Sequence, residues 1–203
     1  SKRGKKLIVS GSAKLRRMGS ITESLAGRAL YVELGPMAWG ELRGVAEPVH
    51  FNRLWDPEFH ESEQILESFD PLPLLQRGFM PPLVPLTGHR DVLNWLEGYV
   101  RTYLERDLRE LSQVDSLINF RRLMQSLALR TGGVLNQADV AKDSHLSHPS
   151  THRYIKLLEV SHIIHRIPAF SVNRSKRLVK SPKVFFVDPA LAVFLSGYYD
   201  AES

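Results

Sequence analysis

The sequence feature that most constrains the fold is a pair of short helix patterns followed by two strand patterns in the second half of the chain. Asn136 and Ser147 stand where helix N-caps belong, each just before a run of residues with helical spacing. The residues SHLS at 144–147 separate the two helices, and this is the turn length of a helix-turn-helix motif. Residues 163–167 and 183–187 then have the character of strands, joined by a polar, basic stretch. This order predicts a winged helix-turn-helix.

The second helix contains THRYIKLLE at 151–159 and is expected to have one apolar face and one basic face. Its core-facing residues would be Tyr154, Leu157 and Leu158. A helix that reads DNA places its N-terminal outward residues against base edges, and an arginine there can donate a forked pair of hydrogen bonds to guanine. The residues expected to face outward are Pro149, Ser150, His152, Arg153 and Lys156.

The charge distribution favours the same surface. The net charge is only +5 over 203 residues, but residues 153–183 carry eight Lys or Arg against one acid. Lysine and arginine at the tip of the strand pair suit phosphates or the minor groove. We therefore predict double-stranded DNA as a partner, bound by Ser150, His152, Arg153 and Lys156 on the helix and by Asn173, Arg174, Lys176 and Arg177 at the tip. The alternative is a solvated or protein-docking surface, because the outer face of a helix is normally charged.

Composition excludes several classes of protein. The chain has no cysteine, which rules out disulfides, cysteine nucleophiles and zinc fingers. It has no apolar run of about 18 residues, so we expect no membrane span and a cytoplasmic location. His145, His148 and His152 are close in sequence, yet no carboxylate stands at a fitting spacing, and we predict no metal site.

The rest of the chain is less regular. Strands are expected at 6–10 and 29–34, and long helices at 91–111 and 120–130. The proline-rich stretch 47–90 is expected to form one helix, near 61–69, and otherwise surface loops. Further predictions are a short helix at 38–43 and a helix-capping role for Asp188.

Seven motifs in register resemble the prokaryotic AAA-type predicted ATPases. They are ESLAGR (23–28), YVELGPMAWGEL (31–42), RGFMPP (77–82), YVRTYLERDLREL (99–111), LALRTGGVLNQADVA (127–141), RYIKLLEVSHIIHRIPAF (153–170) and NRSKRLVKSPKVFFVDPALAVFLSG (173–197). The resemblance implies an N-terminal P-loop domain, a middle winged helix and a C-terminal domain similar to restriction endonucleases. It also implies ATP and magnesium as the cofactors of the family.

The sequence departs from that family at the nucleotide site. A loop of the form GxxxxGK[ST], whose backbone N–H groups hold ATP phosphates, is absent; GKK at 4–6 lacks the first glycine and the hydroxyl residue. We therefore expect this chain to bind no cofactor and to hydrolyse no ATP by itself. The resemblance implies an internal fragment of the family. Ser10 or Ser12 would be its γ-phosphate sensor, and Arg28 would be an arginine acting on a neighbour's nucleotide.

The expected fold class is mixed α/β and helix-rich: a partial P-loop-type sheet remnant, a helical region, then a winged helix-turn-helix. The predicted domains are an ATPase-core remnant at 1–46, a helical lid or linker at 47–115, the winged helix at 116–188, and the start of a truncated domain at 189–203. The predicted function is the DNA- or partner-binding portion of an AAA-type ATP-binding protein. Two alternatives stay open: an interaction or homo-oligomerisation module without DNA binding, and an ATPase partner acting in trans through Arg28.

Overall fold

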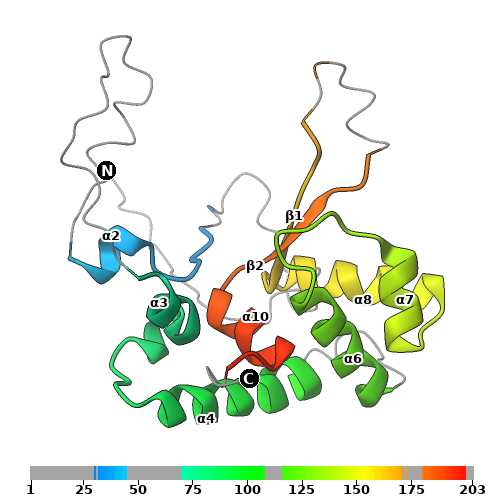
Figure 1. The fold of residues 1–203 in the computed structure, drawn as a ribbon. Helices are drawn as coiled ribbons and strands as arrows, with labels where there is room; N and C mark the ends of the chain where they lie inside the picture. Colours follow the sequence, from blue (N-terminus) through cyan, green and yellow to red (C-terminus); the bar gives the residue numbers. More distant parts are fainter. Residues whose placement is uncertain are drawn as a thin grey trace, which may run out of the picture.

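Helices make up most of the fold. The computed structural model describes residues 30, 32–44, 70–107, 116–170, 172 and 180–199, without the side chains of 105–107. Along this part of the chain the elements are α2 (Trp39–Leu42), α3 (Leu72–Arg77), the 3-10 helix η2 (Pro81–Leu83), α4 (His89–Tyr99), the π-helix η3 (Val100–Asp107), α6 (Leu117–Ala128), α7 (Gln137–Ser144), α8 (His148–Val160), β1 (Ile164–Ile167), β2 (Lys183–Phe186) and α10 (Pro189–Ser196) (Figure 1). The predicted mixed α/β, helix-rich composition is therefore confirmed.

The two helix caps predicted in the second half of the chain are present. Asn136 Oδ1 accepts a hydrogen bond from the backbone N–H of Ala138 at 3.0 Å, where α7 begins. Ser147 Oγ accepts one from the backbone N–H of Ser150 at 3.3 Å, where α8 begins. Each bond satisfies a donor that the first turn of a helix leaves without an intrahelical partner. Between the helices, His145 has a left-handed φ of 52°, which ends α7 and turns the chain into α8.

The strands β1 and β2 form an antiparallel pair. Ile164 lies opposite Phe186, and Ile167 lies opposite Lys183. A third extended segment, between α6 and α7, runs along the other edge of β2: Gly132 N–H donates to the Val184 carbonyl at 2.7 Å, and the neighbouring Val134 forms a bridge with Lys183. The sheet thus joins the loop before α7 to the hairpin after α8.

One hydrophobic core joins the helices to this sheet. Its buried side chains come from η2, α4, α6, α7, α8, both strands and α10. At its centre Phe120 of α6 and Tyr154 of α8 meet edge to face, with ring centroids 5.4 Å apart. This arrangement aligns the rings' oppositely charged edges and faces. The core crosses the sequence positions at which domain boundaries are predicted, 115/116 and 188/189, because α4 and α10 both contribute to it.

The buried carboxylate of Asp188 fixes α10 on the helical region. Asp188 Oδ1 accepts from the backbone N–H of Ala190 at 2.8 Å, which confirms the predicted cap. Its Oδ2 accepts from the backbone N–H of Phe79 at 2.8 Å, just after α3. Helix α10 packs against both α3 and α6 (Figure 1).

The proline-rich stretch differs from its prediction. Loops are expected at 70–90, but α3 and η2 form there. Prolines occupy the first turn of each helix, where the missing N–H is not needed and the fixed φ already suits the helix. The prediction was wrong because it took every proline as a breaker. The short helix predicted at 38–43 is confirmed as α2.

Several predictions fall on other parts of the chain. The described residues of the predicted strand 29–34 belong to no strand ladder in the described structure. The predicted strand 6–10 and helix 61–69 lie outside the described residues. So do the following predicted site residues: Ser10, Ser12, Arg28, Asn173, Arg174, Lys176 and Arg177.

Candidate nucleic-acid interface

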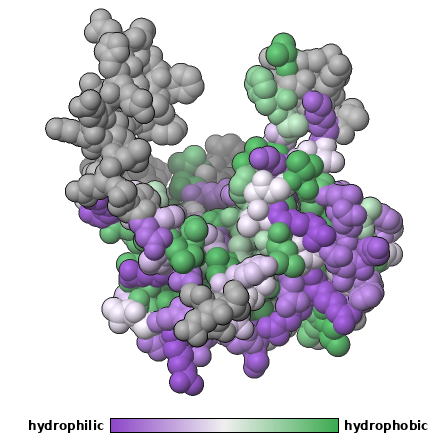
Figure 2. Space-filling model, viewed as in Figure 1, coloured by the Kyte–Doolittle hydropathy of each residue, from purple (hydrophilic) through white to green (hydrophobic). Residues whose placement is uncertain are grey.

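Helix α8 has the two faces that its sequence predicts. Tyr154, Leu157 and Leu158 are buried. Pro149, His152, Arg153 and Lys156 are exposed, whereas Ser150 is half-buried and shares the helix face of Tyr154 and Leu157. The side of the molecule where α7 and α8 lie is mostly hydrophilic (Figure 2). The structure therefore exposes three of the four predicted helix residues, His152, Arg153 and Lys156, and leaves Ser150 half-buried.

Arg153 lies against the ring of its neighbour Tyr154. The guanidinium carbon is 5.1 Å from the Tyr154 ring centroid, and Nη2 donates to the Tyr154 hydroxyl oxygen at 3.4 Å. A cation over an aromatic ring at an exposed site gains only about 0.5–1 kcal/mol. This contact helps to position the guanidinium at the α8 surface.

Glu159 neutralises part of the basic surface. Arg166 of β1 donates to it twice, from Nε at 3.1 Å and from Nη2 at 2.6 Å, and Lys156 Nζ donates at 3.3 Å. These hydrogen bonds hold the pKa of Glu159 below its ordinary value, and those from Arg166 have the largest effect. Two of the eight bases counted between 153 and 183 are thus paired with the one acid there. Glu159 therefore offsets part of the positive charge that Lys156 and Arg166 bring to this surface.

The start of α8 is tied to the start of α7. Ser147 Oγ donates to Ser150 Oγ at 3.0 Å, in addition to accepting from the Ser150 backbone. One turn further, His152 Nδ1 lies 3.3 Å from Oε1 of Gln137, the first residue of α7. The polar ends of the two helices thus form one connected surface.

The hairpin that follows α8 projects from the body of the molecule (Figure 1). Its described residues carry exposed apolar side chains: Ile167, Phe170 at 83% exposure and Val172 at 90%. Lys180 and Lys183 are exposed on the returning side. This hairpin therefore offers both apolar and basic groups beside α8.

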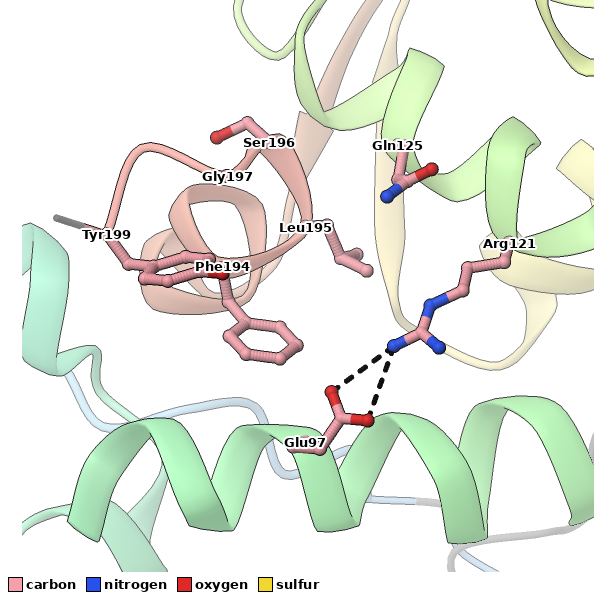
Figure 3. A pocket seen from close by; sticks show the side chains of 8 residues that line it. All are labelled: Glu97, Arg121, Gln125, Phe194, Leu195, Ser196, Gly197 and Tyr199. Atoms are coloured by element: carbon pink, nitrogen blue, oxygen red, sulfur yellow. Dashed lines mark hydrogen bonds and ion pairs between the residues drawn. The ribbon is translucent and has the colours of Figure 1, made fainter. Parts of the chain in front are cut away.

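A second region that could receive a ligand is an open pocket of about 220 Å³ between α4, α6 and α10. Figure 3 shows Arg121 of α6 reaching toward Glu97 of α4, with Nη2 3.2 Å from Oε2. Phe194 and Tyr199 stack beside them with centroids 5.8 Å apart. The charges in this pocket already neutralise each other, so the pocket lacks the excess charge or convergent unpaired donors of a recognition site.

Asp188 is a buried carboxylate with a structural role. Burial raises the pKa of Asp188, but its oxygens are engaged by backbone N–H groups, so the group is structural. In the described ranges no three side chains of His, Asp or Glu gather in a way that could hold a metal ion. No helix in these ranges is long and apolar enough to cross a bilayer.

Sequence reasoning missed two features of this surface. The pairing of Lys156 with Glu159 follows from their spacing of three residues on a helix and could have been found. The contact between Gln137 and His152 joins residues fifteen positions apart on two helices. No local pattern signals that contact, because it depends on the angle at which α7 and α8 meet.

Two curated relatives are similar in sequence to this chain over almost its whole length. They are the uncharacterized protein Mb2031c of Mycobacterium bovis and the uncharacterized protein Rv2008c of Mycobacterium tuberculosis. Each is 27% identical over 195 residues, which is 96% of this chain and 39% of the relative. The chain therefore spans about two fifths of the length of these relatives.

No solved structure matches the chain significantly. Residues 72–202, which run from the first residue of α3 to the C-terminal end, match one family of domains. This match includes α8, the hairpin and the core that supports them. The chain belongs to the family described as Domain of unknown function (DUF8612).

Proposed function

We propose that the chain binds double-stranded DNA through a winged helix-turn-helix made of α6, α7, α8 and the hairpin of β1 and β2. The order of these elements, the short turn at His145 and the third extended segment beside β2 support this assignment. The observation that carries the proposal is the outward face of α8. It places His152 and Arg153 together in the N-terminal half of a helix that the core holds from behind.

Each part has a defined role in this proposal. The N-terminal half of α8 enters the major groove, where Arg153 exchanges its contact with Tyr154 for the two acceptors of guanine. Small residues at the start of α8, capped by Ser147, allow close approach to the bases. The basic hairpin residues Arg174, Lys176 and Arg177, with Asn173, contact phosphates or the minor groove.

A second function is favoured by a specific observation. The hairpin carries Ile167, Phe170 and Val172 as exposed apolar side chains, and phosphate contacts do not need them. A protein-docking hairpin would use them, because apolar residues at the centre of an interface supply most of its binding free energy. The chain would then act as an interaction or homo-oligomerisation module.

The resemblance to AAA-type ATPases gives the wider setting of the proposal. We propose that the chain is the DNA- or partner-binding portion of a longer ATP-binding protein, with ATP and magnesium held elsewhere in that protein. The residues implied for nucleotide sensing and trans action, Ser10, Ser12 and Arg28, are part of this proposal. Measurable metal-dependent ATP turnover by this purified chain would contradict it.

The experiment that tests DNA binding is fluorescence anisotropy of a labelled duplex with three proteins. Arg153→Ala should weaken binding about tenfold or more, since a forked arginine–guanine contact contributes roughly 1–3 kcal/mol. Arg90→Ala is the matched control, because Arg90 is an exposed arginine on α4, outside the proposed interface. Equal affinities for the two variants would contradict the role of α8. No binding by any of the three proteins would shift the assignment to protein docking.

A further inference from the structure

The contact between Gln137 and His152 bears on which ring nitrogen of the histidine carries a proton. Gln137 Oε1 can only accept a hydrogen bond, and His152 Nδ1 lies 3.3 Å from it. For this contact to be a hydrogen bond, the proton of the neutral ring must sit on Nδ1. The other nitrogen, Nε2, then carries an unshared electron pair and can only accept.

This fixed tautomer matters because of where the ring stands. His152 is exposed on the outward face of α8, next to Arg153. In the major groove, adenine and cytosine present amino donors, whereas the guanine edge and thymine O4 present acceptors. A histidine whose free nitrogen only accepts is complementary to an amino group and unsuited to guanine or thymine.

We infer that Gln137 is a positioning residue for base recognition, which holds His152 as a hydrogen-bond acceptor for the amino group of adenine or cytosine. This inference rests on the proposed DNA-binding function and names what that surface reads. Arg153 has only donors and therefore needs an acceptor edge such as guanine. Neighbouring positions on α8 thus select bases of opposite hydrogen-bonding character.

The first part of the test needs no DNA. Long-range proton–nitrogen NMR spectra of ¹⁵N-labelled protein, recorded at a pH where the ring is neutral, distinguish the two tautomers of His152. We expect the Nδ1–H form in the wild type and in Gln137→Glu, which keeps an acceptor oxygen, and its loss in Gln137→Ala. An Nε2–H ring in the wild type, or no change in Gln137→Ala, would overturn the inference.

The second part measures base preference. Wild type and variants are titrated by competition anisotropy against a set of duplexes in which one base pair at a time is changed. The wild type should prefer adenine or cytosine at one position by about threefold to tenfold, as expected for one net hydrogen bond. Gln137→Glu should bind all duplexes less tightly, because it adds a negative charge, but keep that preference. His152→Ala and Gln137→Ala should lose it.

The outcomes distinguish a failure of the inferred role of Gln137 from a failure of the proposed DNA binding. If no duplex binds the wild type, the DNA-binding proposal fails, whatever the tautomer. If duplexes bind but Gln137→Ala keeps the wild-type preference, or the wild type shows no preference for an amino base, the role of Gln137 is overturned. DNA binding itself would then stand.

Discussion

At the scale of single residues, Asp188 joins segments that are more than one hundred positions apart in sequence. Its two oxygens accept from the backbone of Phe79 and of Ala190. Gly78, next to Phe79, has a φ of 77° and no space for a side chain: an added Cβ would stand 2.7 Å from Ala190 Cβ and closer still to Asp188 Oδ1. The sequence predicts the cap at Asp188, but not its partner, because nothing local signals a contact over that separation.

Gly78→Ala should therefore be strongly destabilising. A left-handed φ with extended ψ is available almost only to glycine, and the added methyl group also collides with Asp188. We expect a loss of about 3 kcal/mol or more in the free energy of unfolding, measured with urea. Gly197→Ala is the matched control, since φ there is 82° with open space around the Cβ, and it should cost only about 1 kcal/mol. Similar losses in both would contradict the packing of Gly78 on Asp188.

Asp188 should also make stability depend on pH in a particular direction. Burial raises its pKa in the fold above the ordinary value, so the folded state binds the proton more tightly than the unfolded state. Its contribution to stability is then fully present below the unfolded pKa and is lost as the pH rises through the folded pKa. Relative to Asp188→Asn, the wild type should gain stability as the pH falls from about 7 to about 4. Urea denaturation of both proteins at several pH values checks this, and an opposite slope would refute it.

At the scale of elements, α8 is the best-predicted part of the chain. Its cap at Ser147, its buried Tyr154 and Leu158, and its exposed Arg153 all follow from helical spacing, because one face must meet the core. The proline-rich α3 is the counterexample, since the sequence there carries breaker residues whose effect depends on their position in the helix. Periodicity predicts which face is buried but not which polar side chains meet across two elements.

The pairing of Glu159 on α8 gives a prediction at this scale. Glu159→Gln would release Lys156 and Arg166 and raise the local positive charge by one. DNA affinity at low salt should rise several-fold. The slope of log affinity against log salt should become steeper by about 0.9, the amount expected for one more phosphate contact. The free energy of unfolding should fall by roughly 1 kcal/mol as the partly exposed pair with Arg166 is lost. Unchanged or weaker DNA binding would mean that these two cations lie away from the DNA.

At the scale of the whole molecule, one core unites segments that the sequence predicts as separate domains. Helices α4 and α10 share that core with α6 and α8, and this sharing sets the orientation of the α8 surface. Composition and periodicity indicated α6, α7, α8 and α10, the caps and the outward face of α8, but not α3. They did not indicate how α3 and α10 pack together, because contacts between distant segments depend on the complete three-dimensional arrangement.

We propose that α8 and its hairpin bind duplex DNA, and the salt dependence of binding is the first measurement to make. Anisotropy of a short labelled duplex is followed as salt increases, for the wild type and for a variant with alanine at Arg174, Lys176 and Arg177. We predict that log affinity falls linearly with log salt with a slope of about −4 or steeper, and that the hairpin variant loses roughly 2 to 3 of that slope. No binding at low salt, or equal slopes for the two proteins, would contradict the account and favour a protein-docking surface.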